Sequence, residues 1–299
     1  MRRNPLPPAA PAAPIPVKAG VGLRFPHHKS VLAGEARAAW FEVHPENYLG
    51  DGVIPDILER VRRDFPVSLH ATGLSLGSAD GIDADHLAAI VALAGRIQPG
   101  LISDHLSWSS AGGVHLPDLL PLPYTREAQD VFVRNIDRVQ TALRRPILIE
   151  NPSAYLAWAH SEMREGEFLA GLARRSGCGV LLDINNVAVS AANLGEDPAV
   201  RLHQMLDALP AAAVGEIHLA GHAVRECADG GHVHIDDHGS PVNEDVWDLY
   251  ADTIRRIGPR PALIEWDTAI PAFARLADEA RTADDVMATA LEVRHAAAG

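Results

Sequence analysis

The sequence predicts a single-domain α/β protein with the (β/α)8 TIM-barrel fold. Three observations support this prediction. Eight short apolar segments recur along the 299 residues, segments with helical periodicity separate them, and polar or Gly-containing sequence follows each apolar segment. Strands that alternate with helices form a parallel sheet, and eight strands are the number that closes such a sheet into a barrel.

The expected strands are short runs of β-branched and other apolar residues. Parallel strands covered by helices are buried on both faces, so they read as continuous apolar runs. In chain order, the expected strands cover residues 21–23, 40–43, 67–70, 101–105, 147–150, 180–183, 214–218 and 263–265. We find no internal repeat and no second domain in the sequence, so residues 20–299 are expected to form one metal-binding barrel.

Three of the intervening helices have clear sequence signals. Asp197 followed by Pro198 is typical of an N-cap and a first helical position, and it opens the helix expected over 198–209. Apolar residues at helical spacing predict a second helix over 243–257, which a Gly-Pro pair ends. The same spacing predicts a third helix over 125–143.

An open, doubly wound sheet is the structural alternative. Sheets of that type that bind nucleotides usually carry a Gly-x-Gly-x-x-Gly turn after the first strand. Here Gly20-Val21-Gly22 is followed by Leu-Arg-Phe, so this turn is absent. The barrel is therefore the preferred prediction.

Composition limits the classes of partner. Residues 1–19 are rich in Pro and Ala and lack the continuous apolar segment of a secretory signal, so we expect a disordered tail and a cytoplasmic protein. No apolar run approaches the roughly 18 residues of a membrane span, so no membrane partner is expected. The net charge of −13 argues against a nucleic-acid partner, because proteins that bind nucleic acids normally present a basic face.

The functional prediction comes from the residues at the strand ends. The third to eighth expected strands end, in order, in His70, His105, Glu150, Asp183, His218 and Glu265. Barrel enzymes build their sites at the C-terminal ends of the strands, so these side chains are expected to meet at one rim. Asn186 lies three residues after Asp183, and the alternate residues Asp236 and His238 can point to one side of an extended loop.

This set of side chains predicts a metal site. Imidazole and carboxylate ligands together suit iron, zinc or manganese. Four carboxylates at one rim would repel one another unless cations lay between them or some were protonated. Each residue alone also has an ordinary structural explanation, since a strand-end His can be a hydrogen-bonded core residue and Asp183 could cap the next helix. The coincidence on six strands favours metal binding.

Other polar residues are secondary candidates. Three follow the second strand and could bind substrate or orient ligands, namely His44, Glu46 and Asn47. Three flank the proposed ligands and are expected to support them, namely Asp104, Asn151 and Asp267. Of the loop histidines His27, His28, His115, His222, His232 and His234, His222 could face the site or the substrate. Cys178 and Cys227 form no disulfide framework and are expected to be structural.

The ordered motifs of the chain resemble a known family. They are GVGLRFPHH, WFEVHPENYLG, SLHATGLSLGS, ISDHLSW, LIENPSAYL, LLDINNVAVS, EIHLAGH, DDHGSPV and ALIEWDTAIP. From about residue 20 to about residue 280 they resemble the multinuclear non-haem iron-dependent oxidases. These include the methanobactin biosynthesis B-subunit and relatives long catalogued as uncharacterised proteins. The resemblance implies a barrel of the xylose-isomerase-like type.

The resemblance also implies a mixed-valent cofactor of two or three iron ions. Carried over residue by residue, His70, His105 and Glu150 would hold one iron. Glu150 would bridge to a second iron, completed by Asp183, His218 and Glu265, and these six strand-end residues would be the catalytic set. Asn186, Asp236 and His238 would bind a third and more labile iron. Every one of these positions has the residue type that the family's pattern requires.

Members of that family use dioxygen to modify cysteine residues of ribosomally made precursor peptides. The resemblance therefore implies an oxidase whose product is an oxazolone–thioamide, a thiooxazole or a peptide that has lost carbon. Family members commonly work with a second protein that recognises the leader of the precursor. We see no leader-binding domain in this sequence, so a separate partner protein is expected.

A metal-dependent hydrolase is the main alternative function. The same order of ligands, with His in place of Asn186, resembles endonuclease IV-type apurinic nucleases, in which clustered zinc ions activate water against a phosphodiester. The acidic net charge argues against this function. The amide of Asn186 also argues against it, because zinc favours imidazole or thiolate. A sugar isomerase and a metal-storage or precursor-binding protein are further alternatives.

Overall fold

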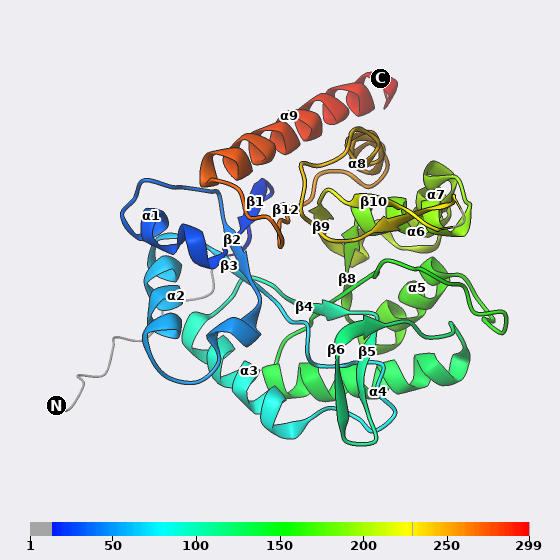
Figure 1. Cartoon of the computed structure of the whole chain (residues 1–299), viewed down its shortest axis with the longest axis horizontal. Coiled ribbons are helices and arrows are strands. Elements are labelled where there is room, and N and C mark those ends of the chain that lie inside the picture. The colour runs from blue at the N-terminus through cyan, green and yellow to red at the C-terminus, as the bar shows by residue number, and fades with distance from the viewer. Residues whose placement is uncertain (1–13, 229, 299) are drawn as a thin grey trace.

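Among the residues that the structure describes, 14–228 and 230–298, the chain forms a closed barrel of eight parallel strands. The structure is a computed structural model, and it confirms the predicted fold class. Around the barrel the strand order is β1-β12-β9-β8-β7-β4-β3-β2, and helices lie at the periphery (Figure 1). The barrel strands are β1 (Ala19–Gly22), β2 (Phe41–Val43), β3 (Val67–His70), β4 (Ile102–His105), β7 (Leu148–Glu150), β8 (Gly179–Asp183), β9 (Val214–Leu219) and β12 (Ala262–Ile264).

Each expected strand is found within two residues of its predicted bounds. Two small differences concern the site. Strand β12 ends at Ile264, so Glu265 is the first residue after the strand, and β9 continues one residue beyond His218. The parallel register pairs His105 with Glu150 and Asp183 with His218, so these side chains start from matching levels of neighbouring strands.

Helices follow the strands and bury their apolar faces against the barrel. They are α1 (His28–Leu32), α2 (Val53–Asp64), α3 (Ala84–Ile97), α4 (Arg126–Leu143), α5 (Glu165–Ser176), α6 (Ile184–Leu194), α7 (Pro198–Ala208), α8 (Glu244–Ile257) and α9 (Phe273–Ala298). The three helices that the sequence delimits are α4, α7 and α8. At the start of α7, Asp197 Oδ1 accepts a hydrogen bond from the Val200 N–H at 3.0 Å, as the predicted N-cap requires.

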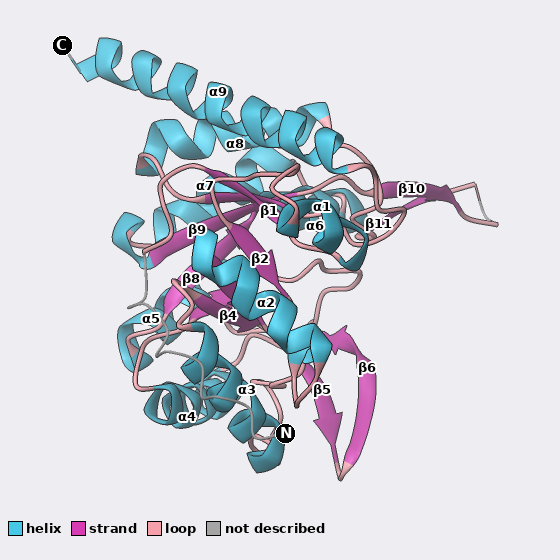
Figure 2. Cartoon of the chain, turned by 90° about the vertical axis from the view of Figure 1, so that its left-hand side faces the viewer, coloured by secondary structure: helices cyan, strands magenta, loops and turns pink. Residues whose placement is uncertain are grey.

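Two β-hairpins that the sequence analysis did not predict project on the same side of the molecule (Figure 2). They consist of β5 (Trp108–Ala111) with β6 (Val114–Leu120), and β10 (Ala223–Glu226) with β11 (His232–Ile235). The Gly112-Gly113 pair between β5 and β6 has φ values of 60° and 76°, which suit a tight hairpin turn. That glycine pair was the available sequence signal. Strand β6 is largely exposed and therefore lacks the buried apolar run by which the barrel strands were predicted.

The N-terminal end of the barrel is closed by Trp40, which is fully buried. Its indole N–H donates to the Lys18 carbonyl at 2.9 Å, and Ile15 packs in the same small cluster. A Cβ at Gly20 would lie 2.3 Å from the Trp40 ring, so this position requires glycine. Ile15 and the first residue of β1, Ala19, fall within the expected tail, whereas residues 1–13 of that tail lie outside the described residues.

None of the helices in the described ranges combines the length and the apolar character that crossing a membrane requires.

Candidate metal centre

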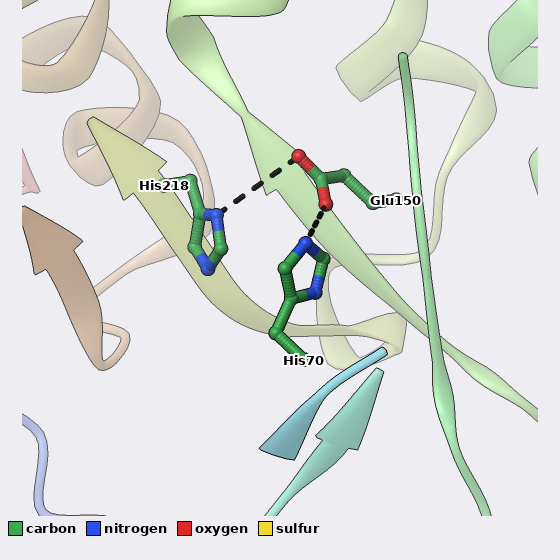
Figure 3. A group of neighbouring side chains, drawn as sticks. All are labelled: His70, Glu150 and His218. Carbon is green, nitrogen blue, oxygen red and sulfur yellow. Dashed lines mark ion pairs between the residues drawn. The ribbon is translucent and has the colours of Figure 1, made fainter. Parts of the chain in front are cut away.

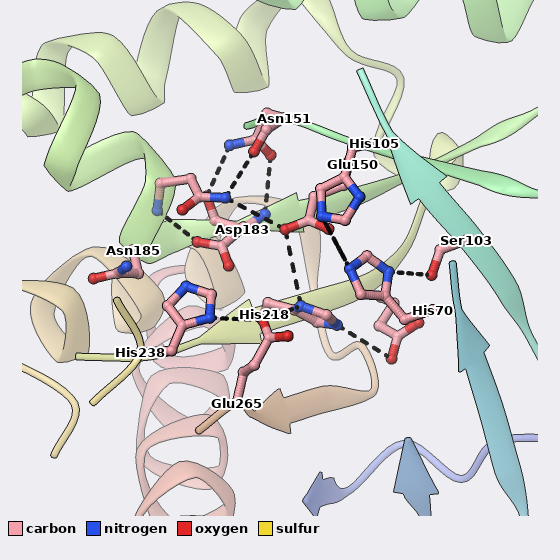
Figure 4. Close-up of polar contacts among 12 residues, drawn as sticks. His70, Ser103, His105, Glu150, Asn151, Asp183, Asn185, His218, His238 and Glu265 are labelled. Carbon is pink, nitrogen blue, oxygen red and sulfur yellow. Dashed lines mark hydrogen bonds and ion pairs between the residues drawn. The ribbon is translucent and has the colours of Figure 1, made fainter. Parts of the chain in front are cut away.

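The six strand-end residues of the sequence prediction converge at the C-terminal mouth of the barrel. They are His70, His105, Glu150, Asp183, His218 and Glu265, and their exposed fractions range from 0% to 6%. Figure 4 shows their side chains pointing toward one another from separate strands. The strand ends therefore bring together donors that lie as much as 195 residues apart in the sequence, from His70 to Glu265.

His70, His105 and Glu150 form the first group of donor atoms. Glu150 Oε2 lies 3.0 Å from His70 Nε2 and 3.3 Å from His105 Nε2. The two Nε2 atoms are 3.2 Å apart. Ligands that bind one metal at bond lengths of about 2.0–2.2 Å lie roughly 3.0–3.4 Å from one another, so the three atoms have the spacing of a shared cation.

Glu150, Asp183, His218 and Glu265 form the second group. One ligand atom from each lies within 4.8 Å of the others. His218 Nδ1 is 2.9 Å from Glu265 Oε2 and 3.9 Å from Glu150 Oε1. Glu150 thus turns one oxygen toward His70 and the other toward His218 (Figure 3), which is the geometry of a carboxylate that belongs to both groups.

Asp183 has two roles at this site. Its Oδ1 accepts a hydrogen bond from the Asn186 backbone N–H at 2.5 Å and so caps α6. The sequence analysis gave this helix cap as the structural alternative for Asp183. Its Oδ2 is buried and lacks a hydrogen-bond partner in the described part of the chain. The capping bond holds the carboxylate in place, and the second oxygen stays available to a cation.

The third predicted group is only partly assembled. His238 Nε2 lies 2.7 Å from Asp236 Oδ1, and the ring reaches the second group through Nδ1, which is 3.4 Å from Glu265 Oε2. Asn186 is directed elsewhere. Its Oδ1 accepts from the Ser153 hydroxyl at 2.8 Å, and its Nδ2 donates to Glu150 Oε1 at 3.3 Å.

The charges at the mouth depend strongly on one another. Burial raises the pKa of Asp183 well above its ordinary range, and the charge of Glu150 raises it further. Burial alone would lower the pKa of His105, but the charges of Glu150 and Asp104 outweigh it and raise the pKa to about 9. Burial likewise opposes the ionisation of Glu150, yet His105 and His70 hold its pKa below the usual value.

Unpartnered buried atoms show that these residues fit a metal. Glu150 Oε2, Asp183 Oδ2 and His238 Nε2 are buried, and no contact that they make with the described residues meets hydrogen-bond geometry. Native proteins rarely leave such groups unsatisfied, because each costs free energy. Cations between these oxygens and nitrogens would satisfy them and would offset the repulsion among the carboxylates.

Two further glutamates lie below the mouth, and the sequence analysis missed both. Glu42 on β2 and Glu216 on β9 are 1% and 0% exposed, and with His218 they form another group with metal-ligand spacing. Burial and the charge of Glu42 raise the pKa of Glu216 to about 8, whereas His218 lowers the pKa of Glu42. The sequence signal that could have revealed Glu216 is its position inside an otherwise apolar strand, two residues before His218.

The residues expected to support the ligands contact them or their strands. Asn151 exchanges two hydrogen bonds with the Asp183 backbone, both at 2.9 Å, and so joins the ends of β7 and β8. Asp267 Oδ2 lies 3.1 Å from His238 Nδ1, and its other oxygen is paired with Arg24. Asp104 Oδ2 accepts from the Leu74 N–H at 3.0 Å.

The candidates after β2 have structural contacts. His44 Nδ1 lies 3.1 Å from the His70 carbonyl oxygen, and Glu46 accepts from the N–H groups of Thr72 and Gly73, both at 3.1 Å. Asn47 is exposed in the short 3-10 helix η2 (Pro45–Tyr48). His44 and Glu46 therefore shape the loop after His70. His44 also forms, with Glu265 and Asp267, a further group with metal-ligand spacing.

The loop histidines divide into two kinds. His222 Nδ1 lies 2.8 Å from Asn185 Oδ1, and His222 Nε2 lies 3.0 Å from His234 Nδ1. Asn185 also donates to Asp236 Oδ1 at 2.8 Å, so these two histidines adjoin the third group. The others lie apart from it. His27 contacts the Pro271 carbonyl, His28 contacts the Tyr48 hydroxyl, and His115 and His232 are exposed.

The two cysteines lie away from the donor groups. Cys178 is buried, and burial raises the pKa of its thiol to about 11, which suppresses the reactive thiolate. Cys227 is exposed on the loop between β10 and β11, and both thiols are free.

Two clefts flank the β5–β6 hairpin near the mouth. A cavity of about 300 Å³ includes Leu106, Tyr124, Pro152 and Ser153, close to His105 and Glu150 in the chain. A wider cleft of about 820 Å³ is lined by residues that include Glu46, Thr72, His86, His115 and Asp118. Leu119 of β6 contributes to both, so the hairpin lies between the two clefts.

Comparison with known sequences gives one consistent result. Residues 18–288 match the family model described as RiPP precursor modification enzyme MbnB/TglH/ChrH. A UPF0276 protein of Caulobacter vibrioides is 50% identical over 281 residues, which cover 93% of this chain and 98% of that protein. A UPF0276 protein of Vibrio vulnificus is 46% identical over 273 residues, which cover 91% of this chain and 92% of that protein.

Comparison with solved structures supports the fold alone, because the sequence identities are low. An L-ribulose 3-epimerase aligns with a TM-score of 0.62 at 14% identity and covers 94% of this chain and 95% of its own. Endonuclease IV from Thermus thermophilus aligns with a TM-score of 0.55 at 16% identity and covers 92% of this chain and 99% of its own. A xylose-isomerase-like TIM barrel protein from Mycobacterium smegmatis, solved with magnesium, aligns with a TM-score of 0.55 at 11% identity and covers 88% of this chain and 89% of its own.

Proposed function

The chain belongs to the family of RiPP precursor modification enzymes MbnB/TglH/ChrH, and from this premise we propose that it is an iron-dependent oxidase that uses dioxygen. Its substrate would be a cysteine residue of a ribosomally synthesised precursor peptide. The observation that carries the proposal is the convergence of His70, His105 and Glu150, whose donor atoms lie 3.0–3.3 Å apart in a buried mouth.

The proposed ligands fall into three sets. His70, His105 and Glu150 would hold one iron, and Glu150 would be shared with a second. Asp183, His218 and Glu265 would complete the second site. Asp236 and His238 would hold a third ion. Asn186 would become its third ligand after the Asn186 amide turns away from Ser153. When bound, the iron would supply the redox chemistry with dioxygen and would hold the cysteine sulfur as a thiolate.

Neighbouring residues would fix the orientation of the ligands. Ser103 Oγ lies 2.8 Å from His70 Nδ1, which leaves His70 Nε2 facing Glu150. A hydrogen bond of this kind fixes the tautomer and the ring orientation of a metal-binding histidine. Arg24 pairs with Asp267 and lies 3.7 Å from Glu265 Oε1, so it balances part of the negative charge at the mouth.

The two clefts beside the β5–β6 hairpin would receive the peptide. Both are lined by residues that follow proposed ligands closely in the chain, such as Thr72, Leu106 and Pro152, and the donor groups themselves are almost fully buried. A bound peptide would therefore place one cysteine in the mouth and exclude bulk water from it, which protects reactive species from side reactions. A separate protein that recognises the leader would deliver the precursor.

A mass-spectrometric assay with defined reagents would test this function. The protein, purified without oxygen and loaded with Fe²⁺, would be mixed with a Cys-containing precursor peptide and a leader-recognising protein, both sought among the neighbouring genes, and air would then be admitted. We expect a mass change on the cysteine, and none with a Cys→Ser peptide or without iron. Loading with zinc alone and nicking of abasic DNA would instead support the hydrolase.

A further inference from the structure

We propose that Glu42 is a positioning residue that accepts the Nε2–H of His218 and thereby directs His218 Nδ1 to the metal. This inference rests on the proposed function only in taking His218 as a ligand. It assigns a task to a buried carboxylate that lies below the mouth and outside the proposed ligand sets.

Both nitrogens of His218 face carboxylates, on opposite sides of the ring. Nδ1 lies 2.9 Å from Glu265 Oε2, within the second donor group. Nε2 lies 3.2 Å from Glu42 Oε1 and 3.8 Å from Glu216 Oε1, below that group. A neutral imidazole offers one nitrogen as a metal ligand and keeps a proton on the other. The proton therefore belongs on Nε2, where Glu42 is the nearer acceptor.

The barrel strands hold Glu42 and His218 in fixed positions. Glu42 is the central residue of β2, and His218 lies on β9 across the barrel interior, so both backbones are held by parallel ladders. His218 is 0% exposed and Glu42 is 1% exposed, so water does not compete for the imidazole N–H. In the described part of the chain, neither the oxygens of Glu42 nor His218 Nε2 has another partner that meets hydrogen-bond geometry. Of the two carboxylate contacts of Nε2, the one with Glu42 is the shorter.

The chemical consequence is a stronger and better-oriented ligand. A carboxylate that accepts from the far nitrogen of a metal-bound histidine fixes its tautomer and raises its basicity, and loss of such a partner typically weakens metal binding by about 10–100-fold. His70 obtains a related contact from the neutral hydroxyl of Ser103, at 2.8 Å from Nδ1. His218 differs because its partner is a carboxylate.

Two isosteric variants test the inference in the full-length protein. We expect Glu42→Gln to raise the dissociation constant for Fe²⁺ by about 10–100-fold, measured without oxygen by chelator competition. Glu216→Gln is the matched control, because Glu216 is equally buried but lies farther from Nε2, and it should change that constant less than threefold. The Co²⁺ absorption spectrum should shift in Glu42→Gln at full occupancy, which a purely structural role would not cause.

A measurement on the unaltered protein does not depend on whether the variants fold. With Zn²⁺ bound and the histidines labelled with ¹⁵N, the His218 resonances, assigned by their loss in His218→Gln, should show a protonated Nε2 and a metal-bound Nδ1. The reverse assignment would overturn the inference. So would equal affinities of Glu42→Gln and the parent protein, or loss of one ion per chain in both glutamine variants, which would make the pair itself a cation site.

These results separate the inference from the proposed function. If the parent chain bound no metal, the proposed oxidase would fail. If the parent chain bound iron and Glu42→Gln bound it equally well, the positioning role alone would fail.

Discussion

His70 and His105 face each other with their Nε2 atoms 3.2 Å apart, and both contact the same oxygen of Glu150. Two imidazoles at this separation cannot both be protonated at Nε2 without strong repulsion. A shared cation would resolve the conflict, because each Nε2 would then act as a ligand and each ring would keep its proton on Nδ1. The relationship between these two rings therefore favours a metal-bound state of the mouth.

Replacing Glu150 with Ala should remove more metal than any other single substitution. Glu150 turns one oxygen to each of the first two donor groups, so its loss opens both. We expect at least a hundredfold loss of peptide modification and release of most bound iron, measured by elemental analysis after desalting. Glu59→Ala, which removes a surface partner of Arg96, is the control and should keep its metal. Full turnover by Glu150→Ala would contradict the assignment.

Replacing His238 with Ala should have a narrower effect. His238 contacts Asp236 and reaches the second group only through Glu265 Oε2, at 3.4 Å. The variant should lose at most one ion per chain and keep the ions held by His70, His105 and Glu150. Elemental analysis compares the metal content of His238→Ala with that of Glu150→Ala. Loss of all metal from His238→Ala would show that the sites depend on one another.

The metal-free protein should become less stable as the pH rises from about 6.5 to about 9. In the folded state the pKa of His105 is raised to about 9, above its unfolded value, so the stabilisation from protonated His105 is complete below about pH 6.5 and is lost as the pH passes through 9. We expect this residue to contribute roughly 1–3 kcal/mol to that loss. Urea unfolding at pH 6.5 and 9.5 measures this loss of unfolding free energy. In the His105→Gln variant, the unfolding free energy should change less between the two pH values.

Metal binding should show the opposite trend with pH. Protons and metal compete for the same imidazole nitrogens, so iron affinity should rise from pH 6 to pH 9. Chelator competition at both pH values would detect this rise.

Cys178→Ser should leave peptide modification nearly intact. The thiol is buried away from the mouth, and its pKa of about 11 keeps it protonated. Placing a hydroxyl in that apolar site should lower the free energy of unfolding by about 1–3 kcal/mol. Denaturant unfolding and the peptide assay test the two parts separately, and a large loss of turnover in a folded variant would give this thiol a role in catalysis.

Gly20→Ala should destabilise the barrel at its N-terminal end. The new Cβ would lie 2.3 Å from the Trp40 ring, which is fully buried and cannot move freely. We expect a loss of about 1–3 kcal/mol in unfolding free energy. Gly95→Ala is the matched control, because Gly95 lies inside α3 with no atom within 4 Å of the added methyl group, and it should stabilise by about 0.5–1 kcal/mol.

The sequence by itself determined the number and order of the barrel strands and the residues at their ends. Continuous apolar runs record burial on both faces, and a His or carboxylate that ends such a run is a local signal. His70, His105, Glu150 and Asp183 are all terminal residues of strands in the structure, as that signal predicts. The hairpins lacked this signal because their strands are largely exposed.

Only the tertiary structure decided which donors face one another. Strand register and closure place Glu150 between His70 and His218, and they bring Glu42 beneath His218 from the far side of the barrel. They also direct the amide of Asn186 to Glu150 and Ser153. The physical reason is that apolar periodicity reports local burial along one strand, whereas distances across a barrel depend on the tilt and stagger of all eight strands together.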